Sequence, residues 1–598
     1  MNLPVEGDTR FARAAWIRAL ERTAALDREP GLTLPALIER QAAALASNPA
    51  LVSPTGALSY GELAARINRY ARWATAQGLQ AGDTAALLMA NSAEYVAIWL
   101  GLTRVGVTVA LLNTHLGGDA LAHCIRIAAP KILIVGAELG AGIEVLRARP
   151  PWPPGCGIFV HGDGASGLPR IEPALAATSA DPLSADECSA PTLDAIALYI
   201  YTSGTTGLPK AAKVSHYRVM RWSQWFAGLL DARAEDRMYN CLPLYHSVGG
   251  VVAVGALLVA GGAVVIRPRF SASEFWRDVH AERCTLFQYI GELCRYLLNS
   301  PHQALDTQHA LRMACGNGLR PEVWEPFQTR FRIPRILEYY ASTEGNFSLY
   351  NCEGRPGAIG RIPSFLQHRL PVSLLKFDLE SGEPVRDSQG LCVPCAIGEA
   401  GEAVGLISEQ ERAGRFEGYA DPEASAKKVL RNVLKAGDAW YRTGDLMRRD
   451  AQGFYYFVDR VGETFRWKGE NVSTAEVLTV IAAVPGVEEG VVYGVSIPGA
   501  DGRAGMAALV VDREFDLGAL HRALVERLPI YARPVFVRLL PALETTGTFK
   551  PRKQELMREG FDPGAIGDPL YIDDPRAGSY RPLDRETHAA IVERRIRF

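Results

Sequence analysis

Short runs rich in β-branched and aromatic residues alternate with longer helical patterns along the first half of the chain. Examples are ALVSP near Leu51, KILIV at Lys131 to Val135 and ALYIYT at Ala197 to Thr202. Strands that alternate with helices usually pair in parallel and are covered by those helices, so the pattern predicts a layered α/β fold. At 598 residues the chain is too long for one core, and we expect a large, divided domain plus at least one smaller domain.

A change in pattern after DRVGE at Asp459 to Glu463 predicts the domain boundary. Beyond it lie a helix from about Ser473, a strand in VEEGVVYGV and a second helix near Leu517 to Leu528. Such a set of elements is typical of a small, separately folded α+β domain. We therefore predict a large amino-terminal domain at 1–459 and a small domain at 460–598.

A second stretch, from about Arg147 to Thr192, differs from its surroundings in composition. It is rich in Pro, Ala, Ser, Gly and Asp, which favour turns over regular elements. We expect it to be a surface connection between subdomains.

Composition and charge exclude several classes of protein. Apolar residues at 48% and charged residues at 22% are typical of a globular protein. The 64 basic and 66 acidic residues nearly balance, so no general attraction to nucleic acid is expected. Ten scattered cysteines and a charged amino terminus without a signal pattern favour a reducing cytoplasm. The pair Cys392 and Cys395 could be half of a zinc site, but lacks a second pair, so ordinary free thiols are expected.

Two apolar stretches are candidates for contact with a membrane. Gly249 to Ile266 is nearly long enough to span a bilayer, but five glycines interrupt it, and Gly261-Gly262 predicts a turn between a buried helix and the strand AVVI. In the first 30 residues, Phe11 and Trp16 belong to an apolar set that could dock weakly on a bilayer or pack on the protein, and we favour packing. Peripheral contact with the inner face of a membrane and a homodimer both stay open.

The segment Y199-IYTSGTTGLPK-A211 carries the strongest chemical signal. A β-like run leads into a loop of glycines and hydroxyl residues that ends in Lys210. Such a loop can bring backbone N–H groups, hydroxyls and an ammonium close to a polyphosphate. It is not a Walker A loop, because Gly204 and Gly207 are too close and no Ser or Thr follows the lysine.

This loop resembles the phosphate loop of the adenylate-forming superfamily. The resemblance implies that the ATP phosphates are held by Thr202, Ser203, Gly204, Thr205, Thr206, Gly207 and Lys210. CGNGL and EYYASTE resemble the superfamily's adenine-pocket and magnesium segments, which adds Gly316, Asn317, Gly318, Glu338, Tyr339 and Tyr340 to the nucleotide site. YRTGD, which ends at Asp445, resembles the ribose-binding segment.

These assignments also make chemical sense from the residues alone. Attack of a carboxylate on the α-phosphate brings two anions together, so a hard cation and hydrogen-bond donors are needed. Glu344 is the natural oxygen ligand for Mg²⁺, and Thr343 can donate to the α-phosphate. Asp445 can accept from the ribose hydroxyls, with Arg460 as a second contact. Ala341 stands where the superfamily usually has glycine, and it would be strained only if that position required a positive φ.

Three further segments are similar to the very-long-chain acyl-CoA synthetase and fatty-acid transport protein family. They are YNCLPLYHSVGG, FRWKGENVSTAEV and TTGTFKPRKQEL, and the tail YIDDPRAGSYRPLD also resembles that family's end. In the family pattern Lys550 matches a mobile catalytic lysine. Lys553 is a second candidate for this role. Alternatively, Lys550 belongs to a solvated basic loop without a catalytic role. His246 could gate the acyl pocket or be a structural histidine. Gly469 could let the backbone approach coenzyme A or be a turn glycine.

The resemblance implies an enzyme that forms acyl-CoA, AMP and pyrophosphate from a fatty acid, MgATP and coenzyme A, with a long-chain fatty acid as the expected substrate. A steroid or bile-acid side-chain CoA ligase is the main alternative, and an aryl-acid ligase is less favoured. A different class is a fatty-acid uptake or binding protein in which ligation is incidental. The small-molecule partners are the acid, ATP and coenzyme A, with no nucleic acid.

Overall fold

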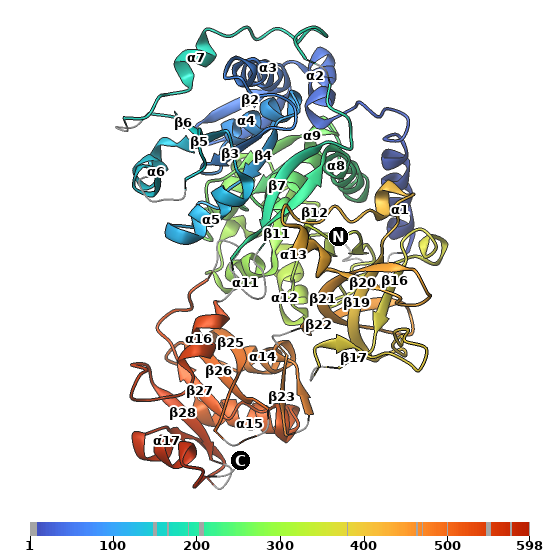
Figure 1. Ribbon diagram of the computed structural model, residues 1–598. Helices are drawn as coiled ribbons and strands as arrows, with labels where there is room; N and C mark the ends of the chain where they lie inside the picture. The colour runs from blue at the N-terminus through green and yellow to red at the C-terminus, as the bar shows by residue number, and fades with distance from the viewer. Residues whose placement is uncertain are drawn as a thin grey trace. The chain divides into compact units, whose positions relative to one another are not determined.

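The computed structural model describes residues 9–147, 152–163, 167–188, 190–202, 208–378, 381–461, 464–468, 470–498, 500, 502–545, 552–574 and 577–596 (Figure 1). The chain forms two compact units. The first unit comprises residues 1–362 and 407–429, and the second comprises residues 363–406 and 430–598.

The first unit contains a six-stranded sheet that is parallel except at one edge. Its order is β6-β5-β3-β4-β7-β8, with only β7 and β8 antiparallel. The strands are β3 (Thr84–Leu88), β4 (Thr108–Leu111), β5 (Ile132–Gly136), β6 (Gly157–His161), β7 (Ile196–Thr202) and β8 (Lys210–Ser215). The helices of this part are α3 (Tyr60–Ala76), α4 (Ala93–Arg104), α5 (Gly118–Ala128), α6 (Gly140–Arg147) and α7 (Glu172–Ala176). Ser59 and Glu62 form a reciprocal capping box at the start of α3.

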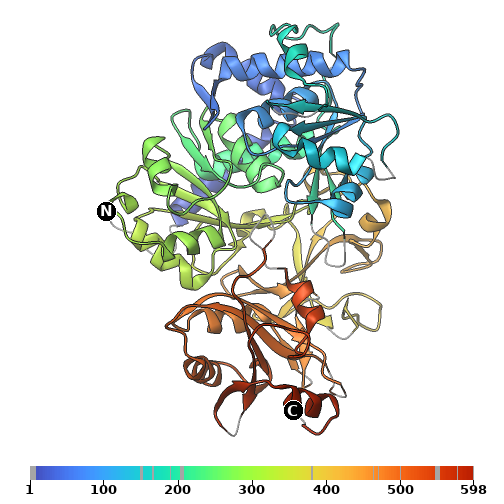
Figure 2. The ribbon, with the colours of Figure 1, turned by 90° about the vertical axis from the view of Figure 1, so that its left-hand side faces the viewer.

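A second sheet of the first unit has the order β2-β1-β10-β9-β11-β12-β13-β14-β15. It contains β1 (Pro49–Ser53), β2 (Gly56–Ser59), β9 (Arg237–Asn240), β10 (Ala263–Ile266), β11 (Leu286–Ile290), β12 (Met313–Asn317), β13 (Ile336–Ala341), β14 (Ser348–Asn351) and β15 (Gly360–Arg361). In Figure 2 the six-stranded sheet lies in the blue to teal part, and most of the second sheet lies in the green part. Helices of this unit include α2 (Leu34–Leu45), α8 (His216–Leu230), α10 (Phe275–Ala281), α11 (Gly291–Asn299), α12 (Pro321–Phe331) and α13 (Pro422–Ala426).

The apolar stretch from Gly249 to Ile266 is buried inside the first unit, as predicted. A π-helical turn at Val248–Ala253 continues into α9 (Val254–Leu258), and β10 follows. Gly261 has φ +81°, which is the left-handed turn conformation that glycine adopts at low cost. None of the helices in the described part of the chain combines the length and apolarity needed to cross a bilayer.

The amino-terminal helix α1 (Thr9–Ala24) packs on the protein, as we expected. Trp16 is 1% exposed, and its ring lies 5.7 Å from that of Trp225 on α8. At Gly228 a Cβ would lie 2.5 Å from the backbone of Ala19, so α1 and α8 approach too closely for any other residue there. The apolar face of α1 is therefore used in the core.

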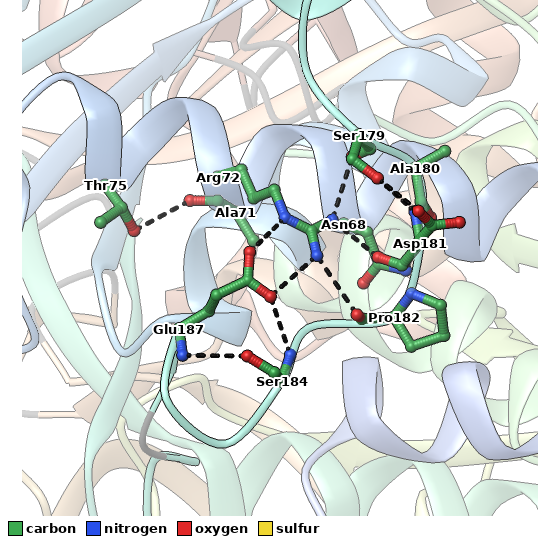
Figure 3. Close-up of polar contacts among 10 residues, drawn as sticks. All are labelled: Asn68, Ala71, Arg72, Thr75, Ser179, Ala180, Asp181, Pro182, Ser184 and Glu187. Carbon is green, nitrogen blue, oxygen red and sulfur yellow. Dashed lines mark hydrogen bonds and ion pairs between the residues drawn. The ribbon is translucent and has the colours of Figure 1, made fainter.

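The segment between Arg147 and Thr192 differs from its predicted role. It contains β6, and it leads to β7 of the same sheet, so it does not connect subdomains. Figure 3 shows how its last part is held on α3: Arg72 donates to Glu187 at 2.6 Å and to the carbonyl of Asp181 at 2.6 Å, and Asn68 donates to the carbonyl of Ala180 at 3.1 Å. Backbone carbonyls that lie outside helices and sheets thereby accept hydrogen bonds from side chains of α3.

The described part of the second unit contains two larger sets of paired strands, together with the two-stranded sheets formed by β17 (Phe377–Asp378) with β18 (Glu383–Pro384) and by β23 (Phe465–Trp467) with β24 (Glu470–Val472). β16 (Val372–Leu375), β19 (Ala400–Leu406), β21 (Ala439–Arg449) and β22 (Phe454–Arg460) pair antiparallel in that order. The other sheet runs β25 (Val487–Val495), β26 (Ala504–Val511), β27 (Phe536–Leu539), β28 (Leu570–Asp574) and β29 (Ser579–Pro582). Its helices are α14 (Thr474–Ala482), α15 (Leu517–Arg527), α16 (Lys553–Glu559) and α17 (Arg585–Val592).

The second of these sheets shares one hydrophobic core with α14, α15 and α17, whose buried residues run from Phe465 to Ile591. The helix expected from about Ser473, the strand in VEEGVVYGV and the helix near Leu517 are all present. A large α/β part and a small α+β part confirm the predicted fold class. The domain boundary between 459 and 460 stays a prediction.

Candidate functional site

A β-hairpin fixes both arms of the predicted phosphate loop. β7 ends at Thr202 and β8 begins at Lys210, and these two residues are cross-strand partners. Tyr201, which points to the opposite face of the strand from Thr202, donates a hydrogen bond to the carbonyl of Cys124 at 2.6 Å. The intervening residues predicted to contact phosphate lie outside the described residues: Ser203, Gly204, Thr205, Thr206 and Gly207.

The predicted metal ligand Glu344 lies beside a tyrosine that sequence reasoning missed. Its side chain is nearly buried, and Oε1 accepts a hydrogen bond from the Tyr419 hydroxyl at 2.8 Å. Lys210 Nζ lies 5.6 Å from the centroid of the Tyr419 ring, within the range of a cation–π interaction. Glu344, Tyr419 and Lys210 therefore form one cluster at the lysine end of the loop.

Thr343 is placed next to the segment that carries His246. The hydroxyls of Thr343 and Ser247 are 3.0 Å apart. His246 is half-buried, and its ring lies 4.6 Å from that of Tyr245. A π-helical turn begins at Val248, and such turns often occur at functional sites. His246, the predicted gate of the acyl pocket, is thus the sequence neighbour of Ser247, whose hydroxyl contacts Thr343.

CGNGL forms the end of β12 and a tight turn. Gly316 pairs with Tyr289 of β11, and a Cβ at Gly316 would lie 2.2 Å from the carbonyl oxygen of Tyr289. Asn317 is the last residue of β12, and Gly318 has φ +78°. Both glycines are therefore required by the backbone, whether or not they also face a nucleotide.

Glu338 holds this turn from inside the protein. It is 2% exposed, and its Oε1 accepts hydrogen bonds from the backbone N–H groups of Gly318 and Leu319. The Tyr289 hydroxyl is hydrogen-bonded to Oε2. Burial raises the pKa of Glu338 to about 8, although these hydrogen bonds oppose the shift. Its observed contacts support the CGNGL turn, and its predicted role in nucleotide binding stays a prediction.

The titration of Glu338 predicts a pH dependence of stability. Between its ordinary pKa of 4.5 and its folded pKa of about 8, the folded state keeps a proton that the unfolded state releases. The free energy of unfolding should therefore fall as pH rises through this window, by about 1.4 kcal/mol per pH unit at most. Glu338→Gln keeps the shape and the neutral hydrogen-bonding groups, so its Tm should depend less on pH between 5 and 8. Parallel Tm profiles for the two proteins would contradict this prediction.

The remaining residues of EYYASTE follow the alternation of β13. Tyr339 is buried, and its ring lies 4.7 Å from that of Phe226 on α8. Tyr340, on the other face, is half-buried and lies 6.1 Å from the ring of Phe347. Ala341 ends the strand, pairs with Ser348 and has no positive φ. Alanine is thus accommodated at the position where the superfamily usually has glycine.

Asp445 and Arg460, the predicted ribose contacts, lie in the second unit. They are cross-strand partners on β21 and β22, and Arg460 Nε lies 3.2 Å from Asp445 Oδ1. Asp445 is 6% exposed, and its backbone N–H donates to the Thr443 hydroxyl at 3.0 Å. The two residues predicted separately as ribose contacts are therefore adjacent in the structure and form an ion pair. Its contact with ribose stays a prediction.

We expect Asp445→Ala to raise the KM for ATP much more than the KM for the acid. Loss of charge-assisted hydrogen bonds to ribose costs roughly 1.5–3 kcal/mol, which corresponds to about 10- to 100-fold. The measurement is the pair of KM values, together with the Tm of the variant. Equal rises for both substrates, accompanied by a lower Tm, would indicate damaged folding instead of a lost ribose contact.

Gly469 and Lys550 lie outside the described residues. Lys553, the competitor of Lys550, begins α16, and its Nζ donates to the Thr474 hydroxyl at 3.3 Å. Thr474 in turn donates its backbone N–H to the buried Asp459 at 2.7 Å. Lys553 therefore contacts Thr474 within the second unit, and the choice of Lys550 as the catalytic lysine stays a prediction.

The described residues fit a magnesium ion that is bound jointly by the protein and by the phosphates of the substrate. No group of three or more His, Cys, Asp or Glu side chains that could hold a metal occurs among them. Mg²⁺ is usually held by one or two carboxylates together with phosphate oxygens, and Glu344 supplies one such carboxylate. Cys392 and Cys395 form no disulfide.

Tyr419 was missed because nothing near it in the sequence points to phosphate or metal. It lies 75 residues after Glu344 along the chain, in the short segment before α13. The only local signal is Asp421-Pro422, which marks the start of that helix. Its place beside the loop depends on the path of the chain in three dimensions.

Comparisons with known proteins agree with this geometry. The profile of the AMP-binding enzyme family matches residues 38–389, and that of the AMP-binding enzyme C-terminal domain matches residues 476–550. The chain therefore belongs to the AMP-binding enzyme family. Within it, the chain is 41% identical to long-chain fatty acid transport protein 1 of Mus musculus over 574 residues, which cover 94% of this chain and 88% of that protein. This places it in the family of fatty-acid transport proteins and very-long-chain acyl-CoA synthetases.

Two solved structures have the same fold. The anthranilate CoA ligase AuaEII in complex with anthranoyl-AMP has a TM-score of 0.76 and 21% identity, and the match covers 90% of this chain and 98% of that chain. ATP-bound MatB from Rhodopseudomonas palustris has a TM-score of 0.73 and 25% identity, and the match covers 88% of this chain and 99% of that chain. Both matches extend over nearly the full length of the solved chains.

Proposed function

We propose that this protein ligates a fatty acid of long or very long chain to coenzyme A. In the first half-reaction the carboxylate attacks the α-phosphate of ATP, forming acyl-adenylate and releasing pyrophosphate. In the second, the sulfur of coenzyme A attacks the acyl carbon, its proton leaves to solvent, and AMP departs with the bond electrons. The observation that carries the proposal is the cluster of Glu344, Tyr419 and Lys210 at the phosphate loop.

This cluster suits the first half-reaction. The two reactants are both anions, so cations and preorganised donors lower the barrier. Lys210 supplies a fixed positive charge at the end of the loop, and the Thr343 hydroxyl can donate to the α-phosphate. A magnesium ion held by Glu344 and the phosphates would neutralise further charge. Lys210, Thr343 and Glu344 all belong to the first unit.

The choice of a fatty acid rests on the relatives and on one segment of the site. The relative reported above is described as a long-chain fatty acid transport protein. His246 lies between the buried Tyr245 and Ser247, at the start of the buried apolar stretch that includes α9. An apolar chain extending from a carboxylate near Thr343 would meet this apolar segment. We therefore assign His246 to the entrance of the acyl site.

The test is formation of AMP and pyrophosphate with a panel of acids. Straight-chain acids of increasing length, steroid acids and aryl acids are each supplied with MgATP and coenzyme A. We expect the highest kcat/KM for long or very long straight-chain acids. A clear preference for steroid acids would establish a bile-acid type of ligase instead.

A second candidate function is capture or uptake of fatty acid, which the name of the relative favours. Tight binding of fatty acid without ATP turnover, at saturating magnesium and coenzyme A, would support this function. Pyrophosphate release that requires both the acid and magnesium would support the ligase.

A further inference from the structure

The segment that carries Tyr419 is fixed on the edge of the phosphate-loop hairpin. The backbone N–H of Lys213 donates to the carbonyl of Gly418 at 2.9 Å, and that of Ala420 donates to the carbonyl of Ala211 at 2.8 Å. Ser215 donates to Glu417 from its backbone N–H at 2.8 Å and from its hydroxyl at 2.6 Å. These contacts leave little freedom to the backbone of Tyr419, so the direction of its side chain is set by β8.

The side chain of Tyr419 contacts two predicted site residues at once. It is 3% exposed, its hydroxyl donates to Glu344 Oε1 at 2.8 Å, and its ring faces Lys210. Lys210 is the cross-strand partner of Thr202, so Tyr419 lies at the base of the phosphate-loop hairpin.

The Tyr419 hydroxyl holds Glu344 through one oxygen, Oε1, at 2.8 Å. The second oxygen of Glu344, Oε2, lies outside this hydrogen bond. Carboxylates that ligate metals are commonly oriented by such partners, whose loss typically lowers metal affinity or activity by about 10- to 100-fold.

We propose that Tyr419 is a positioning residue that orients Glu344 as a metal ligand and joins the metal site to the lysine arm of the phosphate loop. The proposal rests on the proposed function for the identity of the reaction, but the metal site can be tested without it. When nucleotide and metal bind, this one side chain contacts both Lys210 at the end of the loop and Glu344 at the metal. The assignment is independent of which acid is used.

The experiment compares Tyr419→Phe with Tyr201→Phe and the wild type, all as the full chain. Tyr201 is the matched control, because its hydroxyl also makes one buried hydrogen bond next to the loop, to the carbonyl of Cys124 at 2.6 Å, without contacting Glu344 in that bond. The probe is Mn²⁺, titrated by electron paramagnetic resonance into each protein with saturating ATP and no acid or coenzyme A. The Tm of each variant reports how much thermal stability is lost with the hydroxyl.

For Tyr419→Phe we expect the Kd for Mn²⁺ in the ATP complex to rise about 10-fold or more, while Tyr201→Phe stays near the wild-type value. The adenylation rate of Tyr419→Phe should recover partly at high Mg²⁺, and conversion of supplied acyl-adenylate to acyl-CoA should be unchanged. Unchanged Mn²⁺ affinity, equal losses in both variants, or no Mn²⁺ binding by the wild-type complex would each overturn the proposal. A wild type that makes no acyl-adenylate but shows the Tyr419 effect would reject the proposed function alone.

Discussion

Lys550→Ala is expected to slow formation of acyl-adenylate by about 10²-fold or more, the scale for loss of one preorganised electrostatic donor. Transfer of the acyl group from supplied acyl-adenylate to coenzyme A should stay near the wild-type rate. The reason is that the ammonium stabilises charge shared by the carboxylate and the α-phosphate, which exists only in the first transition state. The family pattern implies that this lysine is mobile, so we expect it to leave the site before the thioester forms.

Single-turnover rates of the two half-reactions provide the measurement. Lys553→Ala is the matched control, since Lys553 lies three residues away and its ammonium contacts Thr474 within the second unit. We expect it to affect Tm more than adenylation. If Lys550→Ala slows both half-reactions equally, the assignment of a moving lysine is wrong. If it slows neither, Lys553 becomes the better candidate and Lys550 belongs to a solvated basic loop.

Glu344→Gln is expected to reduce adenylation by about 10²-fold at limiting magnesium, which is the upper end of the range for changes around a metal ligand. Glutamine keeps the volume and one oxygen that can accept from Tyr419, but it removes the negative charge that a hard cation prefers. The fold should therefore stay intact. The measurement is the rate of acyl-adenylate formation across a magnesium titration.

Glu417→Gln provides the control for this prediction. Its carboxylate lies on the same segment as Tyr419, and it accepts hydrogen bonds from Ser215. It should change stability with little effect on the magnesium requirement. A wild-type rate for Glu344→Gln at every magnesium concentration would remove Glu344 from the metal site.

Local patterns in the sequence determined much of the fold. The runs KILIV and ALYIYT are β5 and β7, and the glycines after Gly249 correctly indicated a buried helix, a turn and β10. The elements expected after Ser473 are present for the same reason. Side-chain periodicity and turn residues act over a few positions, so they can be recognised from the sequence without knowledge of the tertiary structure.

Motif spacing determined which residue types the site contains, but packing decided what surrounds them. Glu344 and Lys210 could be chosen from the chemistry that phosphate and magnesium require. Tyr419, which contacts both, is remote in sequence, and its partners are set by pairing of its segment with β8. Likewise, only the structure showed that Glu338 is enclosed by the turn it supports.

Tertiary structure also decided between alternatives that the sequence left open. The apolar face of α1 could meet a bilayer or a protein surface, and contacts with α8 settled it, because Gly228 allows close approach. The segment from Arg147 to Thr192 has the composition of a linker, yet it contains a sheet strand and is held by Arg72. Composition and periodicity describe what a segment can bury or hydrogen-bond. Which partner satisfies it depends on the long-range packing of the whole chain, because burial and hydrogen bonding are completed between segments distant in sequence.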